Sequence, residues 1–240
     1  AELIASVRAW DRLRNRVVWL ALGELGLAYR DSRLKQSLTD AEVGGGRLWG
    51  PTGRWVVLDA TFAVRQGSLS SRVAYSQLAG ALGVELGERV PERELREAVL
   101  ELRRSKGMVL DASDHDTWSA GSFFTNPILT EDQAGSLPED APRFPVTDHS
   151  QVVLGTKEAP VIEGLVKTSA AWLIDHAGFT RGFTVEPGAS AGLSTKHVLA
   201  LTNRGGASGA DLARLRDEIV AGVRERYGVT LVPEPVQVGF

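Results

Sequence analysis

Residues 120–127 read Ala-Gly-Ser-Phe-Phe-Thr-Asn-Pro, a run that combines close backbone approach with polar side chains. The pair Ala120-Gly121 lets the backbone come near a bulky group, and the hydroxyl of Ser122 follows at once. In an extended segment the two phenylalanines point to opposite faces, and the Asn-Pro pair ends the strand. A bend into a core strand is the commoner meaning of such a run. A site that holds a flat ring and delivers a proton is the alternative.

Composition limits the classes of protein to which this run can belong. The chain of 240 residues has room for one large domain or two smaller ones, and 43% hydrophobic residues suffice for a core. A net charge of −3 gives no electrostatic footprint for nucleic acid, and no apolar run approaches the roughly 20 residues of a membrane helix. The absence of cysteine excludes disulfides, thiolate metal sites and thiol nucleophiles. We therefore expect a cytoplasmic protein without nucleic-acid or membrane partners.

Hydrophobic spacing along the rest of the chain predicts both strands and helices. Strands are expected at 3–10, 17–20, 54–64, 198–203 and 229–238, the last interrupted by two prolines. Helices are expected at 76–82 (a helix or a turn), 91–106, 168–175 and 208–227. Because the order of these elements is mixed, the expected class is α+β, with a domain boundary near residue 90.

Two charged residues stand in unusual local contexts. Glu234 lies between Pro233 and Pro235 inside an otherwise apolar run, where it faces either solvent at a sheet edge or a pocket. Arg30 lies between a tyrosine and an aspartate, so it forms either a structural ion pair or a receptor for an anion, since guanidinium matches a carboxylate.

Other polar residues carry weaker signals. Lys106 ends a helix with a basic terminus, which is typical of a solvated cap. The triplet 114–116, Asp-His-Asp, lacks a partner histidine at ligand spacing, so we interpret it as a polar loop and expect no metal site. His197 precedes a predicted strand and suits either a site or a cap.

Five runs, in order along almost the whole chain, resemble motifs of the UDP-N-acetylenolpyruvoylglucosamine reductase family. They are Tyr29-Arg30-Asp31-Ser32, Gly121-Ser122-Phe123-Phe124-Thr125-Asn126-Pro127, Ala171-Trp172-Leu173-Ile174-Asp175, Lys196-His197-Val198-Leu199-Ala200-Leu201-Thr202-Asn203 and Leu231-Val232-Pro233-Glu234-Pro235-Val236. The family has glycine where Ala171 stands.

This resemblance implies roles for three catalytic residues. Ser122 is expected to be the general acid that protonates the substrate carbon next to the carboxylate, and Arg30 to pair with the enolpyruvyl carboxylate. Glu234 is expected on the same carboxylate, in its protonated form, because two ionised carboxylates cannot share a small site.

The same resemblance implies a set of substrate-binding residues. Tyr75 matches the tyrosine of a mobile loop that covers the substrate. Lys106 and Asn126 match positions that hold the UDP diphosphate. His197 and Tyr29 match further positions on the substrate side.

The implied function is NADPH-dependent, FAD-mediated reduction of UDP-N-acetylglucosamine enolpyruvate to UDP-N-acetylmuramate, a step of peptidoglycan and cell-wall biosynthesis. The expected protein is a monomeric UDP-N-acetylmuramate dehydrogenase. A UDP-sugar binding module without flavin is the alternative, and an interaction domain without catalysis is a third.

The resemblance also divides the chain. Residues 1–90 are expected to be the C-terminal part of a FAD-binding domain of PCMH type with the Tyr75 loop. Residues 91–240 are expected to be the substrate-binding reductase domain. For its last strand, 229–240, a return to the first domain is the alternative. The family's glycine-rich flavin segment is not found, and Gly44-Gly45-Gly46 opens no clear helix. We therefore expect the chain to begin beyond that segment and to bind FAD weakly.

Overall fold

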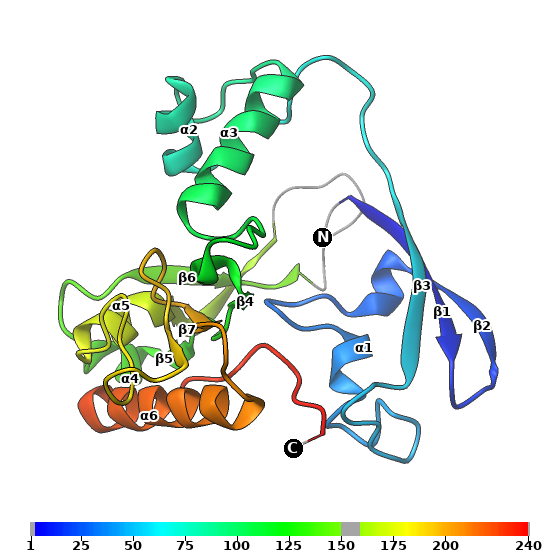
Figure 1. The fold of residues 1–240 in the computed structure, drawn as a ribbon. Coiled ribbons are helices and arrows are strands. Elements are labelled where there is room, and N and C mark those ends of the chain that lie inside the picture. The colour runs from blue at the N-terminus through cyan, green and yellow to red at the C-terminus, as the bar shows by residue number, and fades with distance from the viewer. Residues whose placement is uncertain (1–2, 150–158, 240) are drawn as a thin grey trace. The chain divides into compact units, whose positions relative to one another are not determined.

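The chain divides into two compact units, each described by itself. A computed structural model describes residues 3–149 and 159–239 (Figure 1). Among these, unit 1 holds residues 3–64, 127–149, 159–168 and 234–239. Unit 2 holds Arg65–Asn126 and Ser169–Pro233. The units are discontinuous in sequence, which differs from the single boundary predicted near residue 90. The division of roles between residues 1–90 and 91–240 stays a prediction.

Unit 1 contains two antiparallel sheets and short helices. Its elements are β1 (Ile4–Asp11), β2 (Arg16–Ala21), the 3₁₀ turn η1 (Leu22–Leu25), α1 (Arg33–Gln36), β3 (Trp55–Phe62), β5 (Ile128–Thr130), α4 (Glu131–Gly135), β6 (Arg143–Thr147) and β7 (Val161–Thr168). The strand orders are β2-β1-β3 and β5-β7-β6. Together with unit 2, this mixture of helices and antiparallel sheets confirms the α+β class.

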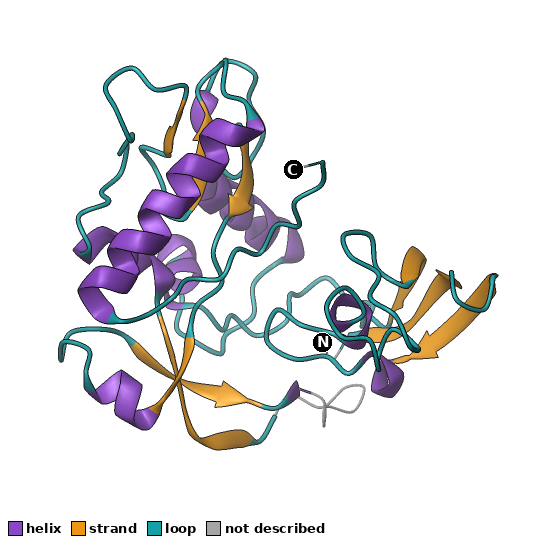
Figure 2. Cartoon of the chain, turned by 90° about the horizontal axis from the view of Figure 1, so that it is seen from below, coloured by secondary structure: helices purple, strands orange, loops and turns teal. Residues whose placement is uncertain are grey.

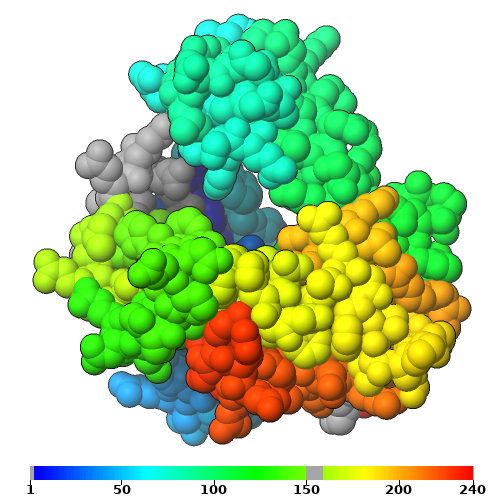
Figure 3. Space-filling view, turned by 90° about the vertical axis from the view of Figure 1, so that its left-hand side faces the viewer, coloured from blue at the N-terminus to red at the C-terminus, as the bar shows by residue number. Residues whose placement is uncertain are grey.

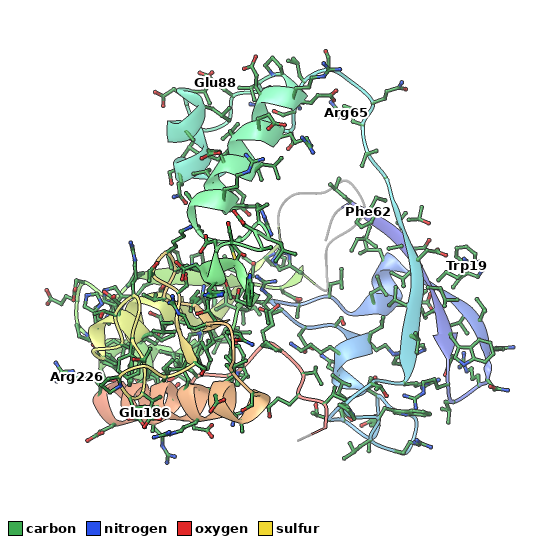
Figure 4. All side chains as sticks on the ribbon, viewed as in Figure 1. Trp19, Phe62, Arg65, Glu88, Glu186 and Arg226 are labelled. Atoms are coloured by element: carbon green, nitrogen blue, oxygen red, sulfur yellow. The ribbon has the colours of Figure 1, made fainter. Side chains whose placement is uncertain are left out.

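The first sheet matches the sequence prediction closely, and Figure 2 shows its three strands together. The predicted strand pair is the hairpin of β1 and β2, and Val7 is aligned with Leu20 across it. One side of the sheet packs a core of Val7, Ala9, Leu20, Leu25 and Trp55. Trp19 and Phe62 are 63% and 58% exposed, and both project from the sheet in Figure 4.

The second sheet was not predicted, for a physical reason. β5 has only three residues, too few for a period-2 pattern, and β6 carries Pro145 in the middle. Proline lacks the amide donor of a sheet ladder, but β6 is an edge strand that pairs with β7 alone. The edge position therefore tolerates Pro145, a residue type that in the sequence argues against a strand.

Unit 2 combines a small sheet with the longest helices. Its elements are α2 (Ser76–Leu82), α3 (Glu92–Ser105), the 3₁₀ turn η2 (His115–Thr117), β4 (Ser119–Ser122), α5 (Ala170–His176), β8 (Ala191–Leu193), β9 (Ala200–Asn203) and α6 (Gly209–Tyr227). The strand order is β4-β9-β8, and all pairs are antiparallel.

The predicted helices of unit 2 form where their caps and apolar positions place them. Ser208 caps α6 by accepting from the Asp211 amide, and Gly228 ends it with a φ of 69°. Leu215, Ile219 and Val223 of α6 are fully buried, and the helix packs on α5. The yellow and orange-red residues adjoin on the face drawn in Figure 3. α3 lies beside α2 (Figure 1) and packs through its predicted stripe, Leu95, Val99 and Leu102.

The predicted last strand at 229–238 is wrong. The stretch contributes an isolated bridge between Pro233 and Phe124, and the Thr125 amide donates to the Val232 carbonyl at 3.0 Å. Two prolines within three residues remove the donors that a continuous ladder needs. Among the residues that the structure describes, no helix is long and apolar enough to span a bilayer.

Candidate functional site

Ser122 ends β4 at an irregular point of the sheet. It is aligned with Ala200 of β9, and the register shifts between Ser119 and Ser122. Gly121 has a φ of 82°, a conformation that side chains disfavour. Directly after Ser122, the ring of Phe124 is buried with 2% exposure. The bulge and the buried ring fix the direction of the half-buried serine between them.

His197 lies against Ser122. Its Nε2 is 3.4 Å from the serine Oγ, a long contact that a small movement shortens to a normal hydrogen bond. His197 is held in the tight loop between β8 and β9. There Ser194 Oγ accepts from the His197 amide at 3.2 Å, and the His197 carbonyl accepts from the Ala200 amide at 3.0 Å. The structure therefore brings together the predicted acid and a residue predicted to lie near the substrate.

The environment of His197 keeps its ring neutral near pH 7. Burial lowers the pKa of His197, and the positive charges of Lys106 and Arg181 lower it further. A neutral imidazole has one nitrogen that donates and one that accepts. His197 can thus hold a hydrogen bond to Ser122 and exchange a proton at its other nitrogen.

Asp116 anchors the loop that carries His197, a role that the sequence did not reveal. Its buried carboxylate accepts from the Thr195 amide at 2.9 Å and from the Thr195 hydroxyl, and Arg204 lies 3.3 Å away. Burial alone would raise the pKa of Asp116, but the Thr195 hydrogen bonds and Arg204 outweigh it and lower that pKa. The neighbouring loop residue Asp114 pairs with Lys196 at 2.5 Å.

Lys106 and Tyr75 lie on the helical pair of unit 2. Lys106 is the C-terminal cap of α3, and its Nζ donates to Gln77 Oε1 of α2 at 2.8 Å. Tyr75 is the residue before α2 and is 75% exposed. An ammonium group and an exposed phenol thus lie near the start of α2, as a surface that contacts a ligand would require.

Asn126 has a structural bond in addition to its predicted role. Its Oδ1 accepts from the Ala170 amide at 3.0 Å, in the first turn of α5. Ser169 caps the same helix by accepting from the Trp172 amide. The side-chain amide of Asn126 therefore has a fixed orientation, with its nitrogen on the side away from that bond.

Arg30 and Glu234 meet in unit 1, although they come from opposite ends of the sequence. Arg30 Nη1 lies 3.3 Å from Glu234 Oε1, and both side chains are partly exposed. The Arg30 backbone has a φ of 54°, and Lys35 Nζ donates to its carbonyl at 3.0 Å. Tyr29, the residue before Arg30, lies with its ring 4.7 Å from the ammonium group of Lys167.

A cavity of about 460 Å³ opens beside this ion pair, entirely within unit 1. Arg30, Lys35 and Glu234 line it together with Ser32. The lining also includes Asp31, whose carboxylate accepts from the Ser32 amide and from Gln36 Nε2. The group that suits a small carboxylate ligand is the Arg30 guanidinium, which the ligand would share with Glu234. Lys35 was not singled out from the sequence, where it reads as an ordinary helix lysine.

A second cavity, of about 300 Å³, lies within unit 2 on the His197 side. Trp172, Arg181, Lys196 and His197 contribute to its lining. The ring of Trp172 stacks on that of His176 at 4.0 Å. Ser122 belongs to this unit, and the Arg30–Glu234 pair belongs to unit 1.

The glycine loop does not fit the pyrophosphate of a flavin. The amides of Gly44, Gly45 and Gly46 donate to the carbonyls of Asp40, Glu42 and Ala41 at 3.0, 3.0 and 2.8 Å. An anion cradle requires amides that point at the ligand, and these point into their own turn. Within residues 3–149 and 159–239 no three His, Asp or Glu side chains gather as a metal site would require.

Sequence comparison agrees with the motif resemblance. Residues 112–238 match the family described as UDP-N-acetylenolpyruvoylglucosamine reductase, C-terminal domain. Proteins named UDP-N-acetylenolpyruvoylglucosamine reductase are similar to nearly the whole chain. The one from Cutibacterium acnes is 48% identical over 238 residues, which is 99% of this chain and 55% of that protein. The one from Streptomyces coelicolor is 48% identical over 237 residues, 98% of this chain and 56% of that protein.

A third relative of the same name, from Thermobifida fusca, is 46% identical over 243 residues, 100% of this chain and 61% of that protein. The chain thus spans 55 to 61% of the length of these relatives. The crystal structure of UDP-N-acetylenolpyruvylglucosamine reductase from Thermus caldophilus is 20% identical, with a TM-score of 0.45, over 97% of this chain and 52% of that one.

Proposed function

Because the chain belongs to the UDP-N-acetylenolpyruvoylglucosamine reductase family, through the C-terminal domain at residues 112–238, we propose that it supplies the substrate-side chemistry of such a reductase. The whole enzyme reduces UDP-N-acetylglucosamine enolpyruvate to UDP-N-acetylmuramate for peptidoglycan synthesis. The reaction is FAD-mediated and NADPH-dependent. The observation that carries the proposal is the pairing of Arg30 with Glu234, since two of the three expected catalytic residues meet from opposite ends of the sequence.

In this proposal the cavity beside Arg30 receives the enolpyruvyl carboxylate. The guanidinium binds the carboxylate, and Lys35 adds positive charge at the same cavity. When hydride adds to one alkene carbon, negative charge builds on the neighbouring carbon and on the carboxylate. Arg30 stabilises that charge where it develops. Glu234, which contacts Arg30 at 3.3 Å, approaches the same carboxylate from the other side.

Ser122 gives its proton to the carbon that carries the developing charge. The carbanion is strongly basic, so a correctly placed hydroxyl is a competent donor. That Ser122 and the Arg30–Glu234 pair act on the same substrate is part of the proposal and rests on the family resemblance of their motifs.

The remaining predicted residues bind the nucleotide part of the substrate. Lys106 supplies a point charge and Asn126 an oriented amide for the diphosphate. Tyr75 covers the bound substrate with its exposed ring, while Tyr29 and His197 complete the substrate side.

The flavin supplies the hydride when it is bound, and NADPH reduces the flavin. We assign no residue of this chain to either cofactor, because the amides of the glycine loop are already used within its own turn. The FAD-domain character of residues 1–90 is part of the proposal and rests on the family resemblance.

The test is Ser122→Ala in the flavin-loaded enzyme that contains this chain, followed by stopped-flow absorbance. Reduction of the flavin by NADPH is expected to proceed at the normal rate, because Ser122 takes no part in it. Reoxidation of the reduced flavin by the enolpyruvyl substrate is expected to slow by about 100-fold or more. Ser136→Ala, which removes an exposed hydroxyl bonded to the Gln133 carbonyl, is the matched control and should reoxidise normally. Normal reoxidation in Ser122→Ala contradicts the acid assignment.

A further inference from the structure

We propose that His197 is a proton relay, which returns a proton to Ser122 as the serine protonates the substrate carbon. The inference rests on the proposed function and adds a step to it. Its basis is the contact between Ser122 Oγ and His197 Nε2 at 3.4 Å, together with the cavity on which His197 opens.

The need for a relay follows from the chemistry of serine. A hydroxyl that gives its proton to carbon becomes an alkoxide, and an isolated alkoxide is a high-energy species in a partly buried site. If a second proton reaches the oxygen in the same transition state, no full negative charge forms on it. A neutral imidazole at hydrogen-bond distance is the side chain best suited to supply that proton.

The step balances in protons and charge. The Ser122 O–H bond breaks as the new C–H bond forms, and the Nε2–H proton of His197 moves to the serine oxygen. A water of the cavity gives a proton to His197 Nδ1 at the same time, so the ring changes from its Nε2–H to its Nδ1–H form and stays neutral. The negative charge of the carbanion ends on the hydroxide that this water becomes, and bulk solvent neutralises the hydroxide. Exchange with solvent then restores the first tautomer.

Both partners are held on ordered backbone. Ser122 ends β4, whose next residue, Phe123, donates its amide to the Leu199 carbonyl at 2.7 Å. The Ser194 hydroxyl fixes His197, and Asp116 binds Thr195, two residues before His197. Catalytic hydrogen bonds are often long before the substrate binds, so the contact at 3.4 Å is suited to shorten in the complex.

The cavity of about 300 Å³ gives water access to His197, so that water can supply the proton to Nδ1. The charged and titratable groups around His197 are Lys106, Arg181 and Lys196, with Asp175 and His176 also on the cavity wall. Lys196 is paired with Asp114. Burial and the charges of Lys106 and Arg181 lower the pKa of His197, so the ring that faces Ser122 is the neutral form which the step requires.

The first experiment is a proton inventory of the flavin-loaded enzyme that contains this chain. Rates of substrate-dependent flavin reoxidation are measured in mixtures of H₂O and D₂O. The wild type should give a curved plot, because the protons of Ser122, His197 and the cavity water move in one step. His197→Gln keeps a polar contact to Ser122 but transfers no proton, so we expect a linear plot and a rate lower by about 100-fold. Added imidazole should partly restore that rate.

His149→Gln is the matched control. His149 is also half-buried, and its Nε2 lies 3.1 Å from the Thr147 hydroxyl, so the variant removes a similar imidazole–hydroxyl contact in unit 1. It should leave both the rate and the curved inventory unchanged. A purely structural role of His197 would slow the reaction without changing the inventory and without rescue by imidazole.

A second readout needs neither flavin nor turnover. Nitrogen-15 NMR of this chain should show His197 in the Nε2–H form, and Ser122→Ala should shift the tautomer balance of His197 but not that of His149. A linear inventory in the wild type, or normal turnover in His197→Gln, overturns the relay alone. An enzyme that reduces no enolpyruvyl substrate overturns the proposed function, and the relay with it.

Discussion

Arg30 shows how much local structure one side chain of the site requires. A non-glycine residue with a φ of 54° costs about 1–2 kcal/mol relative to the ordinary regions. The surrounding turn holds it there, since Ala28 and Asp31 exchange backbone bonds and Lys35 binds the Arg30 carbonyl. Glu234 then binds the guanidinium that this backbone presents. Strain of this kind often accompanies function, and here it directs the predicted carboxylate receptor.

Glu234 gives the sharpest test at this scale. If the residue acts as a neutral acid, Glu234→Gln keeps a hydrogen-bond donor of the same shape, and kcat should fall by about 10-fold or less. Glu234→Ala removes the donor and should cost about 100-fold or more in kcat. Steady-state kinetics of the holoenzyme measures both. Equal losses in the two variants would show that the negative charge, and not the donor, matters.

At the scale of elements, local signals predicted those elements that carry their own caps and periods. α6 was predicted from Ser208, Asp211 and Gly228, because a capping box and a glycine stop are local chemistry. The hairpin of β1 and β2 was also predicted, from the strand-like residues at 3–10 and 17–20. β5 and β6 were not, because a three-residue strand and an edge proline have no distinct period. β7 has eight residues, but Gly164, with a φ of 76°, interrupts its apolar pattern.

In the candidate site, too, local sequence motifs predicted some features, and features that depend on strand pairing were missed. The motif runs identified Ser122, Arg30 and Glu234, but the close contact of Ser122 with His197 depends on the pairing of β4 with β9, which no local pattern contains. Asp116 was assigned to a polar loop, since a buried anchor and a solvated acid have the same sequence signature. Lys35 was missed because a lysine that lines a cavity and a lysine on an exposed helix look the same in the sequence.

The ion pair between Asp11 of β1 and Arg54, the residue before β3, gives a prediction for the stability of unit 1. Asp11, 1% exposed, accepts from Arg54 Nε at 3.0 Å and from Nη2 at 2.8 Å. Asp11→Asn leaves the buried guanidinium without its partner and should lower the free energy of unfolding by about 3 kcal/mol at pH 7. Asp59→Asn, which breaks the exposed Arg8–Asp59 pair between β1 and β3, should cost under about 1 kcal/mol. Urea unfolding measures both.

The same pair sets a pH dependence. Burial would raise the pKa of Asp11. The hydrogen bond and the positive charge of Arg54, together with hydrogen bonds from the amides of Leu13 and Arg14, outweigh burial, so the pKa of Asp11 in the folded protein is lowered. A lowered folded pKa means stability that is present above the ordinary aspartate value and lost as pH falls through the folded value. The difference between wild type and Asp11→Asn should therefore shrink only below about pH 4. A difference that shrinks between pH 6 and 8 would contradict this origin.

At the scale of the whole molecule, the chain has two units and each carries one part of the proposed chemistry. In the proposal, the Arg30–Glu234 pair of unit 1 receives a carboxylate, and Ser122 of unit 2 is the acid, beside His197. The chain matches relatives of which it spans 55 to 61%, so the complete reaction is a property of the enzyme that contains it. The central claim is that one enolpyruvyl group engages both parts.

A crystal structure of the flavin-loaded enzyme with its enolpyruvyl substrate measures this most directly. The account predicts that the substrate carboxylate lies within about 3 Å of the Arg30 guanidinium, and that Ser122 Oγ is within about 3.5 Å of the carbon beside that carboxylate. A substrate that contacts one cluster while the other remains more than about 8 Å from the reacting carbon would contradict the account.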